Sequence, residues 1–264
     1  MKKRIISAIV ALIIVVPLVI YGHEPFILGV GLIGILGLKE IIDLKKHHKR
    51  IPGFMAFMAY ICVFMLTIAE YDGYSIAFGL TYRGLAITML SMFIPTLIYK
   101  KDAYTSKDAI YLCGGIVFLG IAFNGIILTR MFDLWHFVYI ALIPIFTDIF
   151  AMLMGMAFGK HKLIPHVSPN KTIEGSVLGT TIATIVATLF YYFFISKTLI
   201  IKVIVATICL SVLGQFGDLL FSKIKRENNI KDFSQIMPGH GGILDRLDSL
   251  IFVTLGYLIL FSWL

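Results

Sequence analysis

The chain has 264 residues, of which 59% are hydrophobic and only 14% are charged. Soluble domains carry about 25% charged residues, so this composition excludes a water-soluble globular domain and predicts an integral membrane protein. The formal net charge of +8 is attributed to membrane topology and to attraction by anionic lipid headgroups. Membrane lipids are therefore expected partners, and nucleic acid is not.

Nine apolar stretches have lengths near that of a membrane-spanning helix. They lie near residues 5–21, 25–42, 54–70, 84–99, 109–129, 135–156, 175–195, 199–221 and 247–264. The stretch from Tyr71 to Arg83 leaves room for a short half-helix. The prediction is an all-α, polytopic helical bundle that forms a single transmembrane domain over residues 1–264. Within it, spans 1–130 have no assigned role, and 131–264 carry the catalytic spans and the cytoplasmic motifs.

The distribution of lysine and arginine predicts the orientation in the membrane. If the N-terminus is inside, eighteen of the 23 basic residues fall in inner loops or at inner helix ends. This bias predicts an N-in, C-out topology with an odd number of spans. It places the polar motifs described next on the cytoplasmic side, with the inner (plasma) membrane of the cell as the expected location.

A dense polar block occupies residues 222–249, between two long apolar stretches. It combines basic residues, paired carboxylates and a glycine-rich turn, which together are suited to hold phosphates and a divalent metal ion. On a helix, Asp218, Ser222 and Lys225 would share one face. Such a cluster is costly in a membrane protein and therefore predicts a functional site.

Three further aspartates belong to this expectation. Asp245 and Asp248 are three residues apart at the start of the last apolar stretch, so they would also share a helix face. Asp148 lies in the middle of an apolar stretch, where a charge costs roughly 2.5–3.5 kcal/mol and needs a partner, a metal ion or a water-filled cavity. Carboxylate oxygens are the ligands that Mg²⁺ prefers.

A second polar block, residues 159–175, precedes the seventh apolar stretch. Ser168, Asn170 and Thr172 are candidate helix caps. A helix N-terminus beside Lys171 is also suited to bind an anion, although a cap in a basic loop would explain the same residues. Two pairs of glycines four residues apart stand at the edges of the block, Gly155 with Gly159 and Gly175 with Gly179. This spacing permits close helix contact, and it is also common by chance.

These motifs resemble the signature of the phosphatidate cytidylyltransferases, also called CDP-diglyceride synthases. The matching segments are Ser222-Lys223-Ile224-Lys225-Arg226, Lys231-Asp232, Pro238-Gly239-His240-Gly241-Gly242-Ile243-Leu244-Asp245-Arg246-Leu247-Asp248-Ser249, Ser168-Pro169-Asn170-Lys171-Thr172-Ile173-Glu174-Gly175, Gly217-Asp218-Leu219 and Thr147-Asp148. They span residues 147–249, whereas the N-terminal half is similar only in hydropathy. Phe221 stands where the family often has Glu, and Asn170 where Lys is frequent; either difference would shift metal or phosphate affinity.

The resemblance implies that CTP and phosphatidic acid react to give CDP-diacylglycerol and pyrophosphate, with Mg²⁺ required and a second metal ion left open. Asp218 and Asp245 would be catalytic metal ligands, with Asp148 and Asp248 as supporting ligands. The remaining catalytic residues would hold phosphates or donate to the leaving pyrophosphate: Lys225, Arg226, His240 and Arg246. Further contacts to the nucleotide or the lipid phosphate would come from Ser168, Asn170, Lys171, Thr172, Ser222, Lys231, Asp232, Gly239, Gly241 and Gly242. A homodimer is left open.

Other interpretations remain at this stage. The basic residues 223–226 would also suit an ordinary juxtamembrane loop, the segment 245–248 a helix start with local ion pairs, and His240 a turn cap. A CTP-dependent polyprenol or lipid kinase would release CDP instead of forming a CDP-lipid. A lipid or ion transporter would account for the intramembrane carboxylates Asp148 and Asp218. A pure scaffold is disfavoured because the polar clusters are costly.

Overall fold

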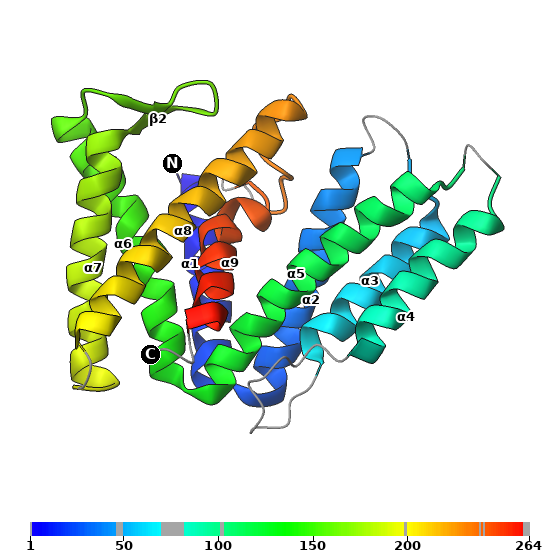
Figure 1. Cartoon of the computed structure of the whole chain (residues 1–264), viewed down its shortest axis with the longest axis horizontal. Coiled ribbons are helices and arrows are strands. Elements are labelled where there is room, and N and C mark those ends of the chain that lie inside the picture. The colour runs from blue at the N-terminus through cyan, green and yellow to red at the C-terminus, as the bar shows by residue number, and fades with distance from the viewer. Residues whose placement is uncertain are drawn as a thin grey trace. The chain divides into compact units, whose positions relative to one another are not determined.

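The computed structural model describes residues 2–45, 50–69, 82–100, 103–197, 200–237, 239 and 241–260. In these ranges the chain forms nine α-helices, one short 3-10 helix and two short strands (Figure 1). In chain order they are α1 (Lys2–Tyr21), α2 (His23–Lys45), α3 (Gly53–Ile68), α4 (Tyr82–Phe93), η1 (Ile94–Leu97), α5 (Ser106–Phe132), α6 (Leu134–Phe158), β1 (Lys162–Ile164), β2 (Ser168–Thr172), α7 (Ile173–Phe194), α8 (Ile200–Glu227) and α9 (Leu244–Leu260).

Each of the nine apolar stretches overlaps one of these α-helices, so the all-α prediction is confirmed for the helical part of the chain. Five helices, α2, α5, α6, α7 and α8, are long and apolar enough to cross a membrane. The protein is therefore an all-α integral membrane protein. Most of the stretch considered for a half-helix lies outside the described residues, and its last two residues begin α4.

The chain divides into two compact units. The first contains residues 1–132 and returns for residues 232–244, and the second contains residues 133–231 and 245–264. The change of unit near residue 132 lies close to the predicted limit of the N-terminal spans. Because the last segment of the first unit is 100 residues away along the chain from its main part, the composition of the units could not be read from the sequence.

In the first unit, α2, α3 and α5 pack around a core of fully buried side chains, among them Leu38, Met55 and Ile116. The end of α5 is tied to the end of α1. Arg130 Nε donates to the Val19 carbonyl at 2.5 Å, and Arg130 Nη2 donates to the Ile20 carbonyl at 2.9 Å. Because the last carbonyls of a helix have no intrahelical donor, the Arg130 guanidinium satisfies the C-terminus of α1.

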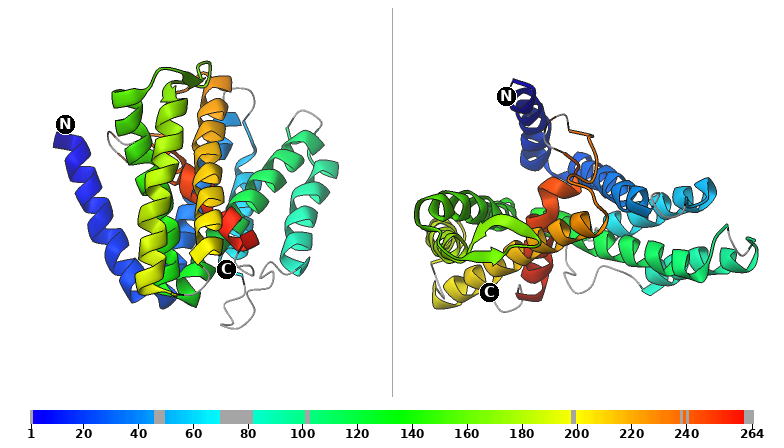
Figure 2. Two further views of the ribbon diagram at one scale, coloured as in Figure 1. Left: turned by 60° about the vertical axis from the view of Figure 1, so that its left-hand side comes forward. Right: turned by 90° about the horizontal axis from the view of Figure 1, so that it is seen from above.

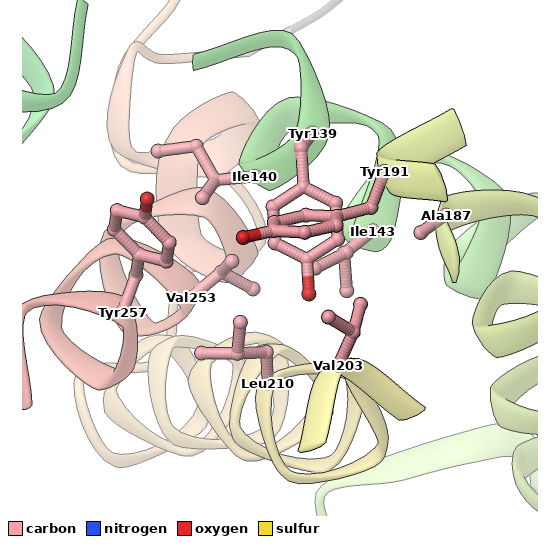
Figure 3. Packing of buried hydrophobic residues seen from close by; sticks show 9 residues of the cluster. All are labelled: Tyr139, Ile140, Ile143, Ala187, Tyr191, Val203, Leu210, Val253 and Tyr257. Atoms are coloured by element: carbon pink, nitrogen blue, oxygen red, sulfur yellow. The ribbon is translucent and has the colours of Figure 1, made fainter. Parts of the chain in front are cut away.

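The second unit consists of α6, α7, α8, the β1–β2 hairpin and α9 from Asp245 onward. Figure 3 shows part of its core, to which all four helices contribute. The rings of Tyr139 and Tyr191 pack edge to face with centroids 5.2 Å apart, and the Tyr139 hydroxyl is 2.8 Å from the Thr207 hydroxyl. Tyr139 and Ile140 lie near the start of α6 and Tyr191 near the end of α7, whereas the hairpin joins the other ends of these two helices, so the aromatic core holds the second unit together away from the hairpin.

Helices α6 and α7 approach closely through glycine. A Cβ atom on Gly179 would lie 2.7 Å from the Ala151 backbone nitrogen, and a Cβ atom on Gly175 would lie 2.5 Å from the Ala151 carbonyl oxygen. No other residue fits at such a distance without moving one of the helices. The prediction that these glycines permit close helix contact is therefore confirmed for the α6–α7 pair.

A short antiparallel hairpin joins α6 to α7 and lies beyond their ends (Figure 2). The all-α prediction did not include it. Thr172 ends β2 and is also the N-cap of α7, because its hydroxyl accepts from the Gly175 N–H at 3.2 Å. Of the three candidate caps only Thr172 serves as one; Ser168 and Asn170 lie in β2, since the extended chain continues to Thr172.

Glu174 closes the base of the hairpin. Its carboxylate accepts from the Lys160 N–H at 3.0 Å and the His161 N–H at 3.2 Å, and it lies 2.6 Å from His161 Nδ1. The carboxylate also stands in the first turn of α7, where the helix dipole favours a negative charge. The hairpin is thus held against the start of α7 at both of its ends.

Candidate active site

A cavity of about 780 Å³ lies within the second unit. Its walls come from α6, the hairpin, α7, α8 and α9. Nine of the residues that the sequence predicted for the site line it: Asp148, Ser168, Asn170, Lys171, Thr172, Asp218, Asp245, Arg246 and Asp248. Both polar blocks therefore contribute to one cavity, although about 50 residues of chain separate them.

Asp218 on α8 is held from two directions. The Lys171 ammonium group, which β2 carries to the cavity, forms an ion pair with the Asp218 carboxylate. From one turn further along α8, the Ser222 hydroxyl donates to Asp218 Oδ1 at 3.3 Å. The shared helix face predicted for Asp218 and Ser222 thus produces a hydrogen bond, whereas the partner from β2 depends on the tertiary fold.

Asp245, in the first turn of α9, pairs with Lys225 in the last turn of α8. The Lys225 Nζ atom is 2.7 Å from Asp245 Oδ1, and only 12% of the lysine side chain and 4% of the aspartate side chain are exposed. Helices α8 and α9 come this close because Gly217 faces α9: a Cβ atom there would lie 2.7 Å from the Asp248 carbonyl oxygen. Lys225 therefore acts on the cavity through Asp245 and does not itself form part of the wall.

Asp148 and Asp248 complete the acidic side of the cavity. Asp148 lies on the α6 wall and is exposed, so the predicted charge inside a span faces open space in the cavity. This is one of the three ways in which the cost of such a charge can be offset. Asp248 is buried and accepts from the Ser249 N–H at 2.7 Å.

Other predicted site residues lie elsewhere. Arg226 is exposed at the end of α8, and Lys231 is exposed after it; neither is in the cavity wall. Four belong to the segment 232–244 of the first unit: Asp232, Gly239, Gly241 and Gly242. His240 lies outside the described residues. Gly239 and Gly241 have positive φ values of 80° and 90°, which a turn made of other residues would rarely adopt.

The structure also adds residues that the sequence analysis did not assign. Lys160 and Lys162 line the cavity, and their place in the second polar block was a usable signal. Gln215 lines it too, accepts from the Ser176 hydroxyl and donates to the Thr180 hydroxyl at 2.7 Å. Gln215 stands three residues before Asp218 on α8, so a polar residue on the same helix face was the available signal.

The charges of the cavity wall suit a polyanion and a divalent cation together. Four carboxylates are balanced by four cationic side chains, those of Lys160, Lys162, Lys171 and Arg246. In the described part of the chain, no three His, Cys, Asp or Glu residues are grouped closely enough to hold a metal ion by themselves. The carboxylates of the wall are oxygen donors of the kind that Mg²⁺ takes from proteins, usually one or two at a time together with substrate phosphates.

Apolar helices long enough to cross a membrane surround a cavity lined by carboxylates and cations, which defines a membrane-embedded protein with a charged internal cavity. Over residues 2–264 the chain matches the Cytidylyltransferase family, and it belongs to this family. It is 35% identical over 254 residues to the phosphatidate cytidylyltransferase of Staphylococcus haemolyticus (strain JCSC1435), covering 96% of each chain. It is 34% identical over 257 residues to the phosphatidate cytidylyltransferase of Bacillus subtilis (strain 168), covering 96% of this chain and 94% of the relative. The family predicted from residues 147–249 is confirmed, and the similarity extends to the N-terminal half.

Proposed function

We propose that this protein transfers CMP from CTP to phosphatidic acid, which gives CDP-diacylglycerol and pyrophosphate for phospholipid biosynthesis. The observation that carries the proposal is the similarity over nearly the whole chain to enzymes named for this reaction. The cavity supports it, because carboxylates and cations of the two polar blocks line one space within membrane-spanning helices.

The chemistry requires charge neutralisation more than proton transfer. A phosphate oxygen of phosphatidic acid attacks the α-phosphorus of CTP in line, and pyrophosphate leaves. Phosphate monoesters are already ionised near pH 7, so no strong general base is needed. Two polyanions must meet, and positioning together with electrostatic stabilisation therefore carries most of the catalysis.

Lys160, Lys162, Lys171 and Arg246 are the cavity cations that would hold the phosphates of the two substrates. Lys171 would do so while it remains close to Asp218, because its ammonium group has three donors and no acceptor. Lys225 would keep the Asp245 carboxylate in place at the start of α9. Arg226 and Lys231 are proposed to contact the nucleotide.

Mg²⁺ is proposed as the cofactor, and it would neutralise phosphate charge and increase the electrophilicity of the α-phosphorus when bound. Asp218 and Asp245 are the carboxylates that would hold it together with the triphosphate, since they come from adjacent helices and line the same cavity. Asp148 and Asp248 would add negative charge around the ion. A second metal ion is left open.

We further propose nine spans with an N-in, C-out orientation in the plasma membrane, so that the cavity faces the cytoplasm. The distribution of eighteen of the 23 basic residues toward the inner side supports this orientation. CTP is a nucleoside triphosphate of the cytoplasm, so a cavity on this side of the membrane would be accessible to it.

The position of the label in CTP distinguishes the proposed reaction from its closest alternative. Purified protein is incubated with phosphatidic acid, Mg²⁺ and CTP that carries ³²P at either the α or the γ position, and the lipid fraction is analysed by thin-layer chromatography and mass spectrometry. The α label is expected in the lipid and the γ label in pyrophosphate. Transfer of the γ label to a polyprenol or other lipid, with release of CDP, would indicate a lipid kinase instead. Lipid movement across liposomes without CTP would favour a transporter.

A further inference from the structure

Glu40, on α2 in the first unit, has a buried carboxylate that accepts three hydrogen bonds. The donors belong to the same unit but are far from Glu40 along the sequence. The Glu40 side chain has no exposed surface. The Ser234 hydroxyl donates to Oε1 at 2.6 Å, the Ile243 N–H donates to Oε1 at 2.8 Å, and the Leu244 N–H donates to Oε2 at 2.9 Å. A buried carboxylate is tolerated when its oxygens are satisfied in this way, and such charge-assisted bonds are about twice as strong as neutral ones.

The three donors stand at the two ends of one segment, residues 232–244. Ser234 is near its beginning, and Ile243 and Leu244 are at its end. Between them, Met237 and Gly241 exchange two backbone hydrogen bonds of 3.0 and 3.1 Å, which close a tight turn. Glu40 therefore ties both ends of a closed loop to one point on α2.

Glu40 also takes the place of a helix cap. Leu244 is the first residue of α9, and the first N–H groups of a helix have no intrahelical acceptor. An N-cap side chain usually supplies that acceptor from the residue before the helix, which here is Ile243 and has no polar side chain. The carboxylate of Glu40 supplies it from α2, and its negative charge also suits the positive end of the helix dipole.

Gly242 is required by the same contact. A Cβ atom at this position would lie 2.4 Å from Glu40 Oε1 and 2.7 Å from Glu40 Cδ. The backbone at Gly242 therefore passes directly over the carboxylate, and a side chain there would displace one of the two. This contact is an explanation for Gly242 that does not involve a nucleotide.

We propose that Glu40 is a positioning residue for the cytidylyl transfer. It touches no substrate; it fixes the residue at which α9 begins, and Asp245 and Asp248 follow one and four residues after Leu244. If the anchor at Leu244 were lost and the next residue took its place, α9 would shift by one residue, and its side chains would move by about 1.5 Å along the axis and by about 100° around it. A displacement of catalytic groups by about 1 Å can lower the reaction rate roughly 100-fold. The proposal rests on the proposed function of the cavity.

The direct test is Glu40→Gln, read by hydrogen exchange and by kinetics. The amide keeps one acceptor oxygen but presents an NH₂ group to a backbone N–H donor, so one of the three bonds is lost. Backbone amides of the peptide that covers residues 241–248 are expected to exchange faster, while those of α5 and α7 exchange at the wild-type rate. We expect kcat to fall by roughly 100-fold, with KM for phosphatidic acid unchanged.

Asp43→Asn is the matched control, because Asp43 lies on the same helix, one turn from Glu40, and has an electrostatic contact with Tyr60 of α3. This variant is expected to keep the exchange pattern and kcat of the wild type. Unchanged exchange in residues 241–248 of Glu40→Gln would overturn the proposal, and so would faster exchange with unchanged kcat. Exchange is measured without substrate, so absence of product from the wild-type protein would refute the proposed function and not the anchoring by Glu40.

A second pair of variants keeps the proposal testable if Glu40→Gln does not fold. Gly242→Ala places a methyl group against the carboxylate and is expected to lower kcat. Glu40→Asp withdraws the carboxylate by one C–C bond, about 1.5 Å, which makes room for that methyl group. The double variant Glu40→Asp/Gly242→Ala is therefore expected to be at least several-fold more active than Gly242→Ala alone. If the two changes reduce kcat independently, the contact does not position α9 and the proposal fails.

Discussion

The ion pair of Lys225 and Asp245 can be tested by a double-mutant cycle that separates stability from activity. The variants are Lys225→Met, Asp245→Asn and the combination of both. Methionine keeps most of the length and apolar surface of lysine, and asparagine keeps the shape of aspartate. Each single change therefore removes one charge and leaves the opposite charge in a place where 12% of Lys225 or 4% of Asp245 is exposed.

The distance of 2.7 Å sets the size of the effect. At an effective dielectric constant of about 20, two unit charges at this separation attract each other by about 6 kcal/mol. Desolvation of both groups offsets much of this attraction, so the net value of the pair is smaller. Removal of one partner from a buried pair typically costs about 3–5 kcal/mol, whereas removal of both can be close to neutral. We expect each single variant to lose about 3–5 kcal/mol in its free energy of unfolding, and the double variant to recover most of this loss.

Activity should follow a different pattern. Asp245→Asn and the double variant are both expected to lose more than about 100-fold in turnover, because the carboxylate that would share Mg²⁺ with the triphosphate is missing from both. The free energy of unfolding is measured by titration of detergent-solubilised protein with SDS, and turnover by release of pyrophosphate. An active double variant would refute a role of Asp245 in the reaction. Additive stability losses would refute the energetic coupling of the pair.

The pair of Lys223 and Glu227 is the matched control on the same helix. Its two side chains are 58% and 61% exposed, and the N–O distance is 3.7 Å. Exposed pairs four residues apart on a helix contribute only about 0.3–0.5 kcal/mol. Lys223→Met is therefore expected to leave both the free energy of unfolding and turnover close to the wild-type values.

Three further predictions concern the cavity wall, the helix packing and the orientation. Asp148→Asn is expected to keep the fold and to raise the Mg²⁺ concentration that gives half-maximal activity, because a negative charge leaves the cavity; an unchanged Mg²⁺ titration would exclude Asp148 from the metal environment. Gly179→Leu should destabilise the protein by at least about 1–3 kcal/mol in SDS titrations, since its side chain would overlap the Ala151 backbone 2.7–2.9 Å away, and wild-type stability would contradict the close α6–α7 contact. After replacement of the three native cysteines by alanine, single cysteines at Asn170 and Glu227 should react with an impermeant thiol reagent only when the cytoplasmic face is exposed, and labelling from outside would contradict the proposed orientation.

The positions of the helices could be predicted because they depend on local information. A run of about 20 apolar residues has few structures available in a bilayer, since every backbone polar group must find its partner within the segment. The shared faces of Asp218 with Ser222 and of Asp245 with Asp248 follow from the helical repeat alone. Thr172 was recognisable only as one of three candidate caps, and Gly175 and Gly179 only as a spacing that permits close contact. That these glycines meet Ala151 of α6 was decided by the tertiary structure.

The tertiary structure alone decided which cationic partner Asp218 and Asp245 receive. Lys171 reaches Asp218 across 47 residues of sequence because an unpredicted hairpin carries β2 to the cavity. Its strands have three and five residues, too few for an alternating pattern to stand out in the sequence. Nothing in the sequence singled out Glu40, yet it caps a helix that begins 204 residues later. The sequence by itself determined which residues are charged and on which helix face they stand. The packing of distant segments determined which opposite charges and which donors and acceptors meet. The physical reason is that an ion pair or a hydrogen bond forms only between atoms a few ångströms apart in space, whatever their separation along the chain.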